Sequence, residues 1–328
     1  MAGYLFDPDE GETILEPEAS GLGSWVGAPS AYRKDGLTYL SYRRRRPRGS
    51  GRGYATFLAV SEDRSPFREL WCVSKETLYT SSIERCAIVE GGEGFILYVS
   101  YVDPNDHRWC IDACTTPSAA DLGDAVATRK PVLRAVPLGL DAVKDPVVVR
   151  AGGLYWMYVS CATRALGAEE ASTERLHASD DVYTTGLINS ETGLAVSRDG
   201  LQFEWLGTVL RVNEGHWDAY AARVSAVATL AGLRLAFYDG SARVEQNYEE
   251  QTGVALMVAP TELRRLSVGD PWLVSANGSG SLRYMSTVRT PEGFEFYYEW
   301  ARKDGSHETR RSALDLKQIA IEGVLAHE

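Results

Sequence analysis

The apolar positions of the chain fall into short, strand-like runs, and one pattern of runs occurs five times. Each copy has an apolar run, a short turn that ends in Gly, and a second run rich in Tyr, Phe and Leu. These side chains favour strands, and Gly supplies the positive φ of tight turns, so each copy predicts a β-hairpin. The five hairpins are expected at residues 27–43, 84–101, 144–160, 222–240 and 282–300.

A third strand-like run follows each hairpin, and a fourth, edge strand fits after some of them. The copies begin near residues 27, 84, 144, 222 and 282, which gives a period of roughly 60 residues. Amphipathic helices are scarce. Repetition at this period with strands alone predicts an all-β fold, a five-bladed β-propeller of four-stranded antiparallel blades that forms a single domain over residues 1–328. A β-sandwich would not repeat the same hairpin five times. Residues 1–26 are expected to cover the propeller or to help close its ring.

The charge of the chain narrows the classes of partner. Of the 328 residues 44% are hydrophobic, so the chain can bury a core, and the net charge is −11 with a pI near 5.1. An acidic protein lacks the broad basic face that nucleic acid or an anionic membrane requires, so neither is expected as a partner. The run "YRRRRPRG" at 42–49 is the exception. A solvated loop is the favoured interpretation, a local anion or phosphate site the second, and a nucleic-acid contact the third.

Processing signals, cysteines and histidines together predict the compartment of the protein and whether it binds a metal. The first twenty residues lack the basic and then apolar regions of a signal peptide, and no apolar stretch of about 18 residues occurs. The five cysteines are odd in number and scattered, which suits a reducing compartment, so we expect a cytoplasmic protein. Cys110 and Cys114 have no second Cys or His pair, and the histidines lack metal-ligand spacing, so we expect no metal and no cofactor.

The predicted repeat assigns chemistry to one face. Turns between the first two strands of each copy are tight, whereas the connections on the opposite face are long and polar, so the functional pocket is expected there, at the mouth of the central axis. The side chains at the starts of the innermost strands would converge on that mouth and perturb one another's pKa values. Two interpretations remain open: an acid–base site, or an ion-pair network that plugs the channel. The converging residues are Ala28, Glu84, Asp145, Arg223 and Arg283, with neighbours Arg85, Lys144 and Tyr284.

Residues 27–314 resemble the five-bladed propeller glycosidases of families 43 and 32 and the related family 130 mannoside phosphorylases. The resemblance rests on the hairpins and on "KDPVVV", "GLAVSRDGLQFEW" and "WDAYAARV". In those hydrolases, carboxylates at the starts of innermost strands act as general acid, general base and pKa tuner. The resemblance therefore implies that Glu84 is the proton donor and Asp145 its carboxylate partner.

The first repeat departs from that pattern, because Gly27 and Ala28 stand where the hydrolases carry an Asp. An inverting mechanism needs two carboxyl groups, one to protonate the leaving group and one to activate water. Glu84 and Asp145 can form such a pair with different roles. Spare carboxylates on the same face are Asp218, Asp239, Glu245 and Glu299.

The phosphorylases offer another explanation of the missing carboxylate. Their first blade resembles this one, including an Arg matched by Arg43, and they use a single acidic residue where Glu84 stands. Phosphate then replaces the activated water. Arg43, Arg45 and Lys144 could hold it, since guanidinium groups suit tetrahedral oxyanions. The Asp-Pro-Arg of their second blade is Glu-Arg-Cys here.

The sequence thus predicts an enzyme that cleaves a glycosidic bond in a small saccharide or glycoside. The alternatives are a family 130-like phosphorylase that also uses phosphate, and a propeller that has lost hydrolysis and binds or transforms a sugar-like metabolite. The predicted catalytic residues are Glu84 and Asp145. The predicted substrate-binding residues are Arg43, Arg85, Lys144, Asp218, Arg223, Asp239, Glu245, Arg283, Tyr284 and Glu299.

Overall fold

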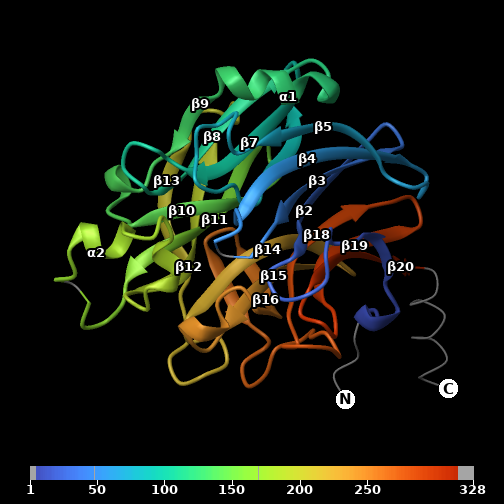
Figure 1. Ribbon diagram of the computed structural model, residues 1–328. Coiled ribbons are helices and arrows are strands. Elements are labelled where there is room, and N and C mark those ends of the chain that lie inside the picture. Colours follow the sequence, from blue (N-terminus) through green and yellow to red (C-terminus); the bar gives the residue numbers. More distant parts are fainter. Residues whose placement is uncertain (1–4, 48, 169, 317–328) are drawn as a thin grey trace.

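The protein is built almost wholly from antiparallel strands. The structure, a computed structural model, describes residues 5–47, 49–168 and 170–316 (Figure 1). Within these residues the two α-helices are one turn each, α1 (Leu122–Ala125) and α2 (Thr173–His177), and neither is long and apolar enough to cross a membrane. The all-β class predicted from the sequence is confirmed.

In the described part of the chain the strands form five units of four antiparallel strands, which follow chain order except that β1 joins the last unit. Unit 1 contains β2 (Trp25–Lys34), β3 (Leu37–Arg45), β4 (Gly53–Glu62) and β5 (Arg68–Ser74). Unit 2 contains β6 (Ala87–Gly91), β7 (Gly94–Val102), β8 (Trp109–Thr116) and β9 (Lys130–Leu133). Unit 3 contains β10 (Ala142–Ala151), β11 (Leu154–Arg164), β12 (Ile188–Ser197) and β13 (Glu204–Leu210). Unit 4 contains β14 (Ala221–Leu230), β15 (Leu233–Ser241), β16 (Gln251–Ala259) and β17 (Glu262–Arg265). Unit 5 contains β18 (Leu282–Arg289), β19 (Gly293–Ala301), β20 (His307–Asp315) and, from the N-terminal segment, β1 (Glu12–Leu15).

The first strands of the five units contact one another in cyclic order, from β2 through β6, β10, β14 and β18 back to β2. The first and last units are joined by a parallel bridge between Trp25 and His307, and Figure 1 shows the blue sheet of unit 1 beside the red sheet of unit 5. Because β1 completes unit 5, the segment before residue 27 takes part in joining the two ends of the chain.

The apolar core lies between neighbouring units, not at their common centre. Each interface has its own cluster of buried side chains, and this packing of sheet on sheet leaves the middle free for polar groups. Typical pairs are Leu58 with Leu97, Tyr98 with Met157, Leu194 with Ala236, Phe237 with Phe296, and Leu40 with Tyr297.

The inner strands carry bulges at equivalent places. In β2, β10, β14 and β18 the pairing register shifts near the start of the strand. The bulge residues Ala28, Asp145 and Tyr284 have φ of 52°, 55° and 53°. A left-handed backbone is uncommon outside Gly and is unfavourable for Ala and Tyr, so the surrounding structure must hold it.

The backbone N–H at the bulge level has no partner in the strand ladder, and in every unit a side chain of a neighbouring unit accepts it. These hydrogen bonds hold the inner strands against one another, so several of the polar side chains have a structural role. The donors and acceptors are Ala28 to Glu299 (3.0 Å), Arg85 to Asp145 (3.2 Å), Asp145 to Ser100 (3.2 Å), Val224 to Thr192 (2.8 Å) and Tyr284 to Asp239 (3.0 Å).

Candidate functional site

The polar starts of the inner strands form two levels. Cross-strand pairing fixes which residues are equivalent, since the residue before each bulge pairs with the end of the second strand. The sequence interpretation mixed the two levels, because the extra bulge residue cannot be seen in the pattern. The first level contains Gly27, Glu84, Lys144, Arg223 and Arg283, and the second Ala28, Arg85, Asp145, Val224 and Tyr284.

Around these levels lies a buried set of polar residues that we call the central cluster. Each of its side chains belongs to a residue that is at most 6% exposed. The members are Arg43, Arg45, Glu84, Arg85, Lys144, Asp145, Arg223, Asp239, Glu250, Arg283, Tyr284 and Glu299.

Glu84 lies among cations. Its carboxylate accepts a hydrogen bond from Arg43 Nε at 2.6 Å and lies 3.5 Å from Arg45 Nη1. Burial opposes its ionisation, but the charges of Arg43, Lys144 and Arg45 outweigh burial and hold the pKa of Glu84 well below its usual range. In this environment Glu84 is an ionised carboxylate, whereas a proton donor needs a raised pKa. The geometry therefore does not favour the donor role predicted for Glu84.

Tyr284 connects the two predicted catalytic residues. Its hydroxyl lies 3.5 Å from Glu84 Oε2 and 3.4 Å from Asp145 Oδ2, and Lys144 Nζ lies 3.4 Å from that same Asp145 oxygen. Because both oxygens lie this close to one hydroxyl, they are at most about 7 Å apart. This limit includes the separation of the two carboxyl groups in retaining glycosidases and the lower end of that separation in inverting glycosidases. Burial and the two carboxylates raise the pKa of Tyr284 well above its usual value, so the phenol keeps its proton. The structure thus brings Glu84 and Asp145 together, as expected.

Glu299 fills the place that the first repeat leaves empty. A Cβ on Gly27 would lie 2.0 Å from Glu299 Oε2, so only glycine leaves room for this carboxylate. Glu299 also accepts two hydrogen bonds from Arg283, at 2.7 and 3.0 Å, and approaches His307 Nδ1 at 2.8 Å. Unit 5 therefore supplies a carboxylate at the position where unit 1 has none.

Glu250 is the functional candidate that the sequence interpretation missed. It is fully buried, accepts a hydrogen bond from Arg283 Nη1 at 2.6 Å and forms an ion pair with Arg223. Burial opposes its ionisation, but the two guanidinium charges lower the pKa of Glu250 to about 2. It directly precedes β16, the third strand of unit 4, so a search confined to first strands could not find it; the doublet "EE" before "QTG" is the available signal.

Asp239 is a carboxyl group whose pKa shifts in the opposite direction, because burial outweighs the nearby positive charges. Both of its oxygens lie 3.0 to 3.1 Å from the backbone N of Tyr284, and burial raises its pKa to about 7, with Arg223 opposing the shift and Glu250 adding to it. An acid catalyst at neutral pH requires such a value. Asp239 therefore suits proton donation better than Glu84 does.

The raised pKa of Asp239 predicts a pH-dependent cost to stability. Between pH 4 and 7 the folded protein holds a proton that the unfolded chain releases, so this group makes the fold less stable as the pH rises through that window. Asp239→Asn keeps an acceptor for Tyr284 N–H and cannot titrate. The difference in free energy of unfolding, variant minus wild type, should be greater at pH 7.5 than at pH 5 by about 2 kcal/mol. Urea unfolding of both proteins at the two pH values measures it, and a constant difference would contradict the prediction.

Three predicted site residues have other tasks. Arg85 donates to the carbonyls of Ser225 (2.7 Å) and Met285 (3.0 Å), so its guanidinium ties units 2, 4 and 5 together instead of facing a substrate. Asp218 is paired with Arg265 at 2.6 Å, and Glu245 is exposed in the short helical turn Val244–Gln246. The structure brings neither carboxylate into contact with the central cluster.

The directions of the arginine side chains at 43–46 follow from the alternation of side chains along strand β3. Strand β3 continues to Arg45, and alternate side chains of a strand face opposite sides. Arg43 and Arg45 face inward and are buried, whereas Arg44 donates to the Glu16 carbonyl and Arg46 pairs with Glu18 at 3.4 Å. For Arg43 and Arg45 the solvated-loop interpretation is wrong.

Loops of three units meet over the central cluster. Arg52 of the β3–β4 loop lies 3.2 Å from Asp181 Oδ2 of the β11–β12 connection, and Tyr248 of the β15–β16 loop donates its hydroxyl to the same carboxylate. The ring of Tyr248 covers the guanidinium of Arg45, 4.1 Å away. Arg52, Asp180 and Tyr248 all have positive φ, at 53°, 55° and 83°. We call this contact the cover; its Tyr248 ring lies on Arg45, which is an ionic partner of Glu84.

Tyr248→Phe is expected to loosen the cover without removing the ring from Arg45. Loss of one hydrogen bond to a charged acceptor corresponds to about 1.5 kcal/mol, so backbone amides at 244–250 and 181–188 should exchange hydrogen about 10-fold faster. Tyr98→Phe is the matched control, because its hydroxyl bonds the Gly200 carbonyl elsewhere. Peptide-resolved hydrogen exchange measures both. Unchanged exchange at the cover in Tyr248→Phe would show that this contact does not hold it closed.

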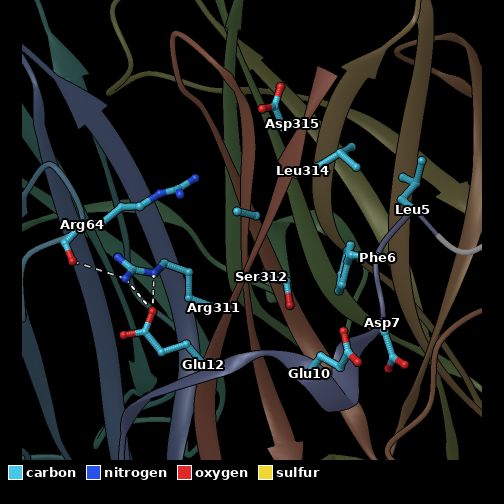
Figure 2. A pocket seen from close by; sticks show the side chains of 11 residues that line it. Leu5, Phe6, Asp7, Glu10, Glu12, Arg64, Arg311, Ser312, Leu314 and Asp315 are labelled. Carbon is cyan, nitrogen blue, oxygen red and sulfur yellow. Dashed lines mark hydrogen bonds and ion pairs between the residues drawn. The ribbon is translucent and has the colours of Figure 1, made fainter. Parts of the chain in front are cut away.

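Several surface cavities lie outside the central cluster. One, of about 590 Å³, lies between the N-terminal segment and β20; Figure 2 shows Leu5 and Phe6 on one side of it and Arg64 and Arg311 on the other, with Arg311 bound to Glu12. Another, of about 540 Å³, lies on the rim of units 2 and 3, where His107 contacts Asp180 at 2.8 Å beside the cover. Among the described residues no three His, Cys, Asp or Glu side chains are grouped as metal ligands.

The fold is similar to that of solved carbohydrate-active enzymes. A glycosyl hydrolase from Bacteroides ovatus aligns with a TM-score of 0.61 at 13% identity over 96% of this chain and 94% of its own. A thermostable family-43 glycoside hydrolase gives 0.60 at 14% over 91% of each chain. The β-1,2-mannobiose phosphorylase of Listeria innocua, in complex with β-1,2-mannobiose, gives 0.59 at 14% over 94% of this chain and 95% of its own. No family model and no curated protein matches the sequence. At these identities the likeness concerns the fold, and it agrees with the resemblance drawn from the sequence.

Proposed function

We propose that the chain is a single-domain, five-bladed β-propeller enzyme that cleaves a glycosidic bond of a small saccharide or glycoside at its central cluster. Five four-stranded units whose first strands contact in cyclic order support the architecture. The observation that carries the function is that the Tyr284 hydroxyl lies within 3.5 Å of both Glu84 and Asp145. Two carboxyl groups at this spacing are the minimal equipment for glycoside hydrolysis.

The roles follow from the surroundings of each group. Glu84, held ionised by Arg43 and Arg45, is the carboxylate that activates water or stabilises the positive charge of the transition state. Asp239, with its pKa near 7, protonates the leaving oxygen. Asp145, fixed by Arg85 N–H and next to Lys144, is the second carboxyl group beside Tyr284.

Backbone strain supports a functional assignment. Asp145 and Tyr284 both occupy left-handed bulges, and such outliers concentrate where a site needs side chains in positions that a regular strand cannot reach. Ala28 has the same backbone and no functional group, and Glu299 supplies the carboxylate there.

Phosphorolysis is the second candidate. Arg43, Arg45 and Lys144 surround Glu84, and a solved mannobiose phosphorylase shares the fold. Phosphate held by these cations would attack the sugar in place of water. A third candidate, ligand binding without turnover, is favoured by Ala28, which puts no carboxyl group at the start of the first inner strand.

A panel of aryl glycosides, incubated with and without inorganic phosphate, distinguishes hydrolysis, phosphorolysis and ligand binding without turnover. Release of the aryl alcohol without phosphate supports hydrolysis, and release only with phosphate supports phosphorolysis. Stabilisation of the protein by a sugar with no release under either condition supports binding alone. Neither release nor stabilisation would reject the proposal.

A further inference from the structure

The central cluster contains more positive than negative groups. Its cations are Arg43, Arg45, Arg85, Lys144, Arg223 and Arg283, and its carboxyl groups are Glu84, Asp145, Asp239, Glu250 and Glu299. The neighbouring pairs His307 with Glu249 and Arg52 with Asp181 balance themselves. Even with all five carboxyl groups ionised, one positive charge is left over in a buried region. Buried charges are normally compensated, so the cluster is incomplete as it stands.

The same region has hydrogen-bond donors without acceptors. Arg43 Nη1, Arg43 Nη2 and Arg45 Nε are buried and make no hydrogen bond, although Arg43 Nη2 has Glu299 at 3.8 Å as an ionic neighbour. Lys144 Nζ pairs with Asp145 at 3.4 Å and also interacts with the charge of Glu84. Buried polar groups in proteins almost always have partners, so unpaired donors call for an occupant.

These donors converge. Arg43 and Arg45 are two residues apart on β3, so they share one face of the strand, and both contact the carboxylate of Glu84. Lys144 lies on the first level beside Glu84 and contributes to lowering its pKa. An occupant held by all three must offer oxygen acceptors and negative charge.

We propose that Arg43, Arg45 and Lys144 form a subsite for the carboxylate of an acidic sugar, so that the substrate is a uronic-acid type glycoside. The inference rests on the proposed function, because it names the substrate class of the same site. A carboxylate supplies negative charge, which the cluster lacks, and its planar pair of oxygens matches two guanidinium donors.

The rings beside these cations fit a sugar better than a bare ion. Arg43 lies 5.5 Å from the ring centre of Tyr284, Arg45 lies 4.9 Å from that of Trp25, and Lys144 lies 5.0 Å from that of Trp109. Aromatic faces next to oriented polar groups are the usual lining of a small-molecule site.

Titration calorimetry on the wild-type protein tests the subsite directly. Glucuronate and galacturonate are compared with glucose and galactose, and with inorganic phosphate and sulfate. At least one uronate should bind at least about 10-fold more tightly than its neutral sugar, the gain expected from charge-assisted hydrogen bonds. Equal binding of uronates and neutral sugars, binding of phosphate alone, or no binding of either would overturn the proposal.

A matched pair of variants locates the site. Arg45→Lys keeps the charge and loses the unpaired Nε donor, so it should weaken uronate binding about 10-fold. Arg44→Lys makes the same change one residue earlier, where the side chain faces outward, and should leave binding unchanged. Equal effects of the two variants would overturn the assignment.

Failure of the subsite and failure of the enzyme are distinguishable. Turnover of neutral aryl glycosides without uronate binding would leave the proposed function standing and reject the subsite. Uronate binding without turnover of any aryl glycoside or aryl uronide would leave the subsite standing and reject the enzyme.

Discussion

Glu84→Gln is expected to lower turnover at least about 100-fold and to reduce the free energy of unfolding by about 3–5 kcal/mol. The carboxylate is 2% exposed and pairs with Arg43 and Arg45, while Lys144 adds a third positive charge nearby. An amide would leave these cations without their counter-charge in a buried site, which costs more than the loss of one hydrogen bond. Initial rates and urea unfolding at pH 7 measure the two effects.

Two further variants separate chemistry from stability at this position. Glu84→Asp keeps the charge and moves the carboxylate back by about one bond, so it should retain most of the stability while turnover falls steeply. Glu90→Gln makes the same chemical change at a half-exposed carboxylate paired with Lys34 and Arg150, where about 1 kcal/mol or less is expected. Near-normal turnover in folded Glu84→Gln would remove Glu84 from the mechanism.

Asp145→Asn is expected to lower turnover at least about 100-fold and to reduce the free energy of unfolding by about 3 kcal/mol, because the buried Lys144 loses its paired charge. Asn keeps an oxygen that accepts Arg85 N–H, and Asn is one of the few residues that tolerate the φ of 55° found here. It loses the charge and the ability to accept or donate a proton beside Tyr284. Initial rates on a responsive glycoside and urea unfolding measure the two quantities.

Asp145→Ala is the comparison that isolates the structural role. It removes the acceptor of Arg85 N–H as well and places Ala in a left-handed backbone, so a further loss of about 2–3 kcal/mol is expected. If Asp145→Asn kept wild-type turnover while Asp145→Ala unfolded, the carboxyl group would serve only to join units 2 and 3.

The sequence alone determined the strands and their repetition. Alternating and continuous apolar runs around Gly turns depend on local conformational preference and on burial of one strand face, and both can be read from neighbouring residues. The hairpins at 27–43, 84–101, 144–160, 222–240 and 282–300 are confirmed by the antiparallel pairing of their strands. The sequence also identified Glu84, Asp145 and Tyr284 as neighbours at one end of the inner strands.

Only the tertiary structure decided the level and the partner of each polar group. Cross-strand pairing aligns Glu84 with Lys144 and Arg283, so Asp145 and Tyr284 lie one residue further along, in the bulges of β10 and β18, and no local pattern marks that register. Glu250 enters the central cluster from a third strand, whereas Asp218 pairs with Arg265 outside it. Whether the assembled residues catalyse a reaction stays a prediction. The pKa of Glu84 depends on Arg43, Lys144 and Arg45, and that of Asp239 on burial, Arg223 and Glu250. Asp239 with its raised pKa and Glu84 with its lowered one could therefore be told apart only after folding had brought these groups together.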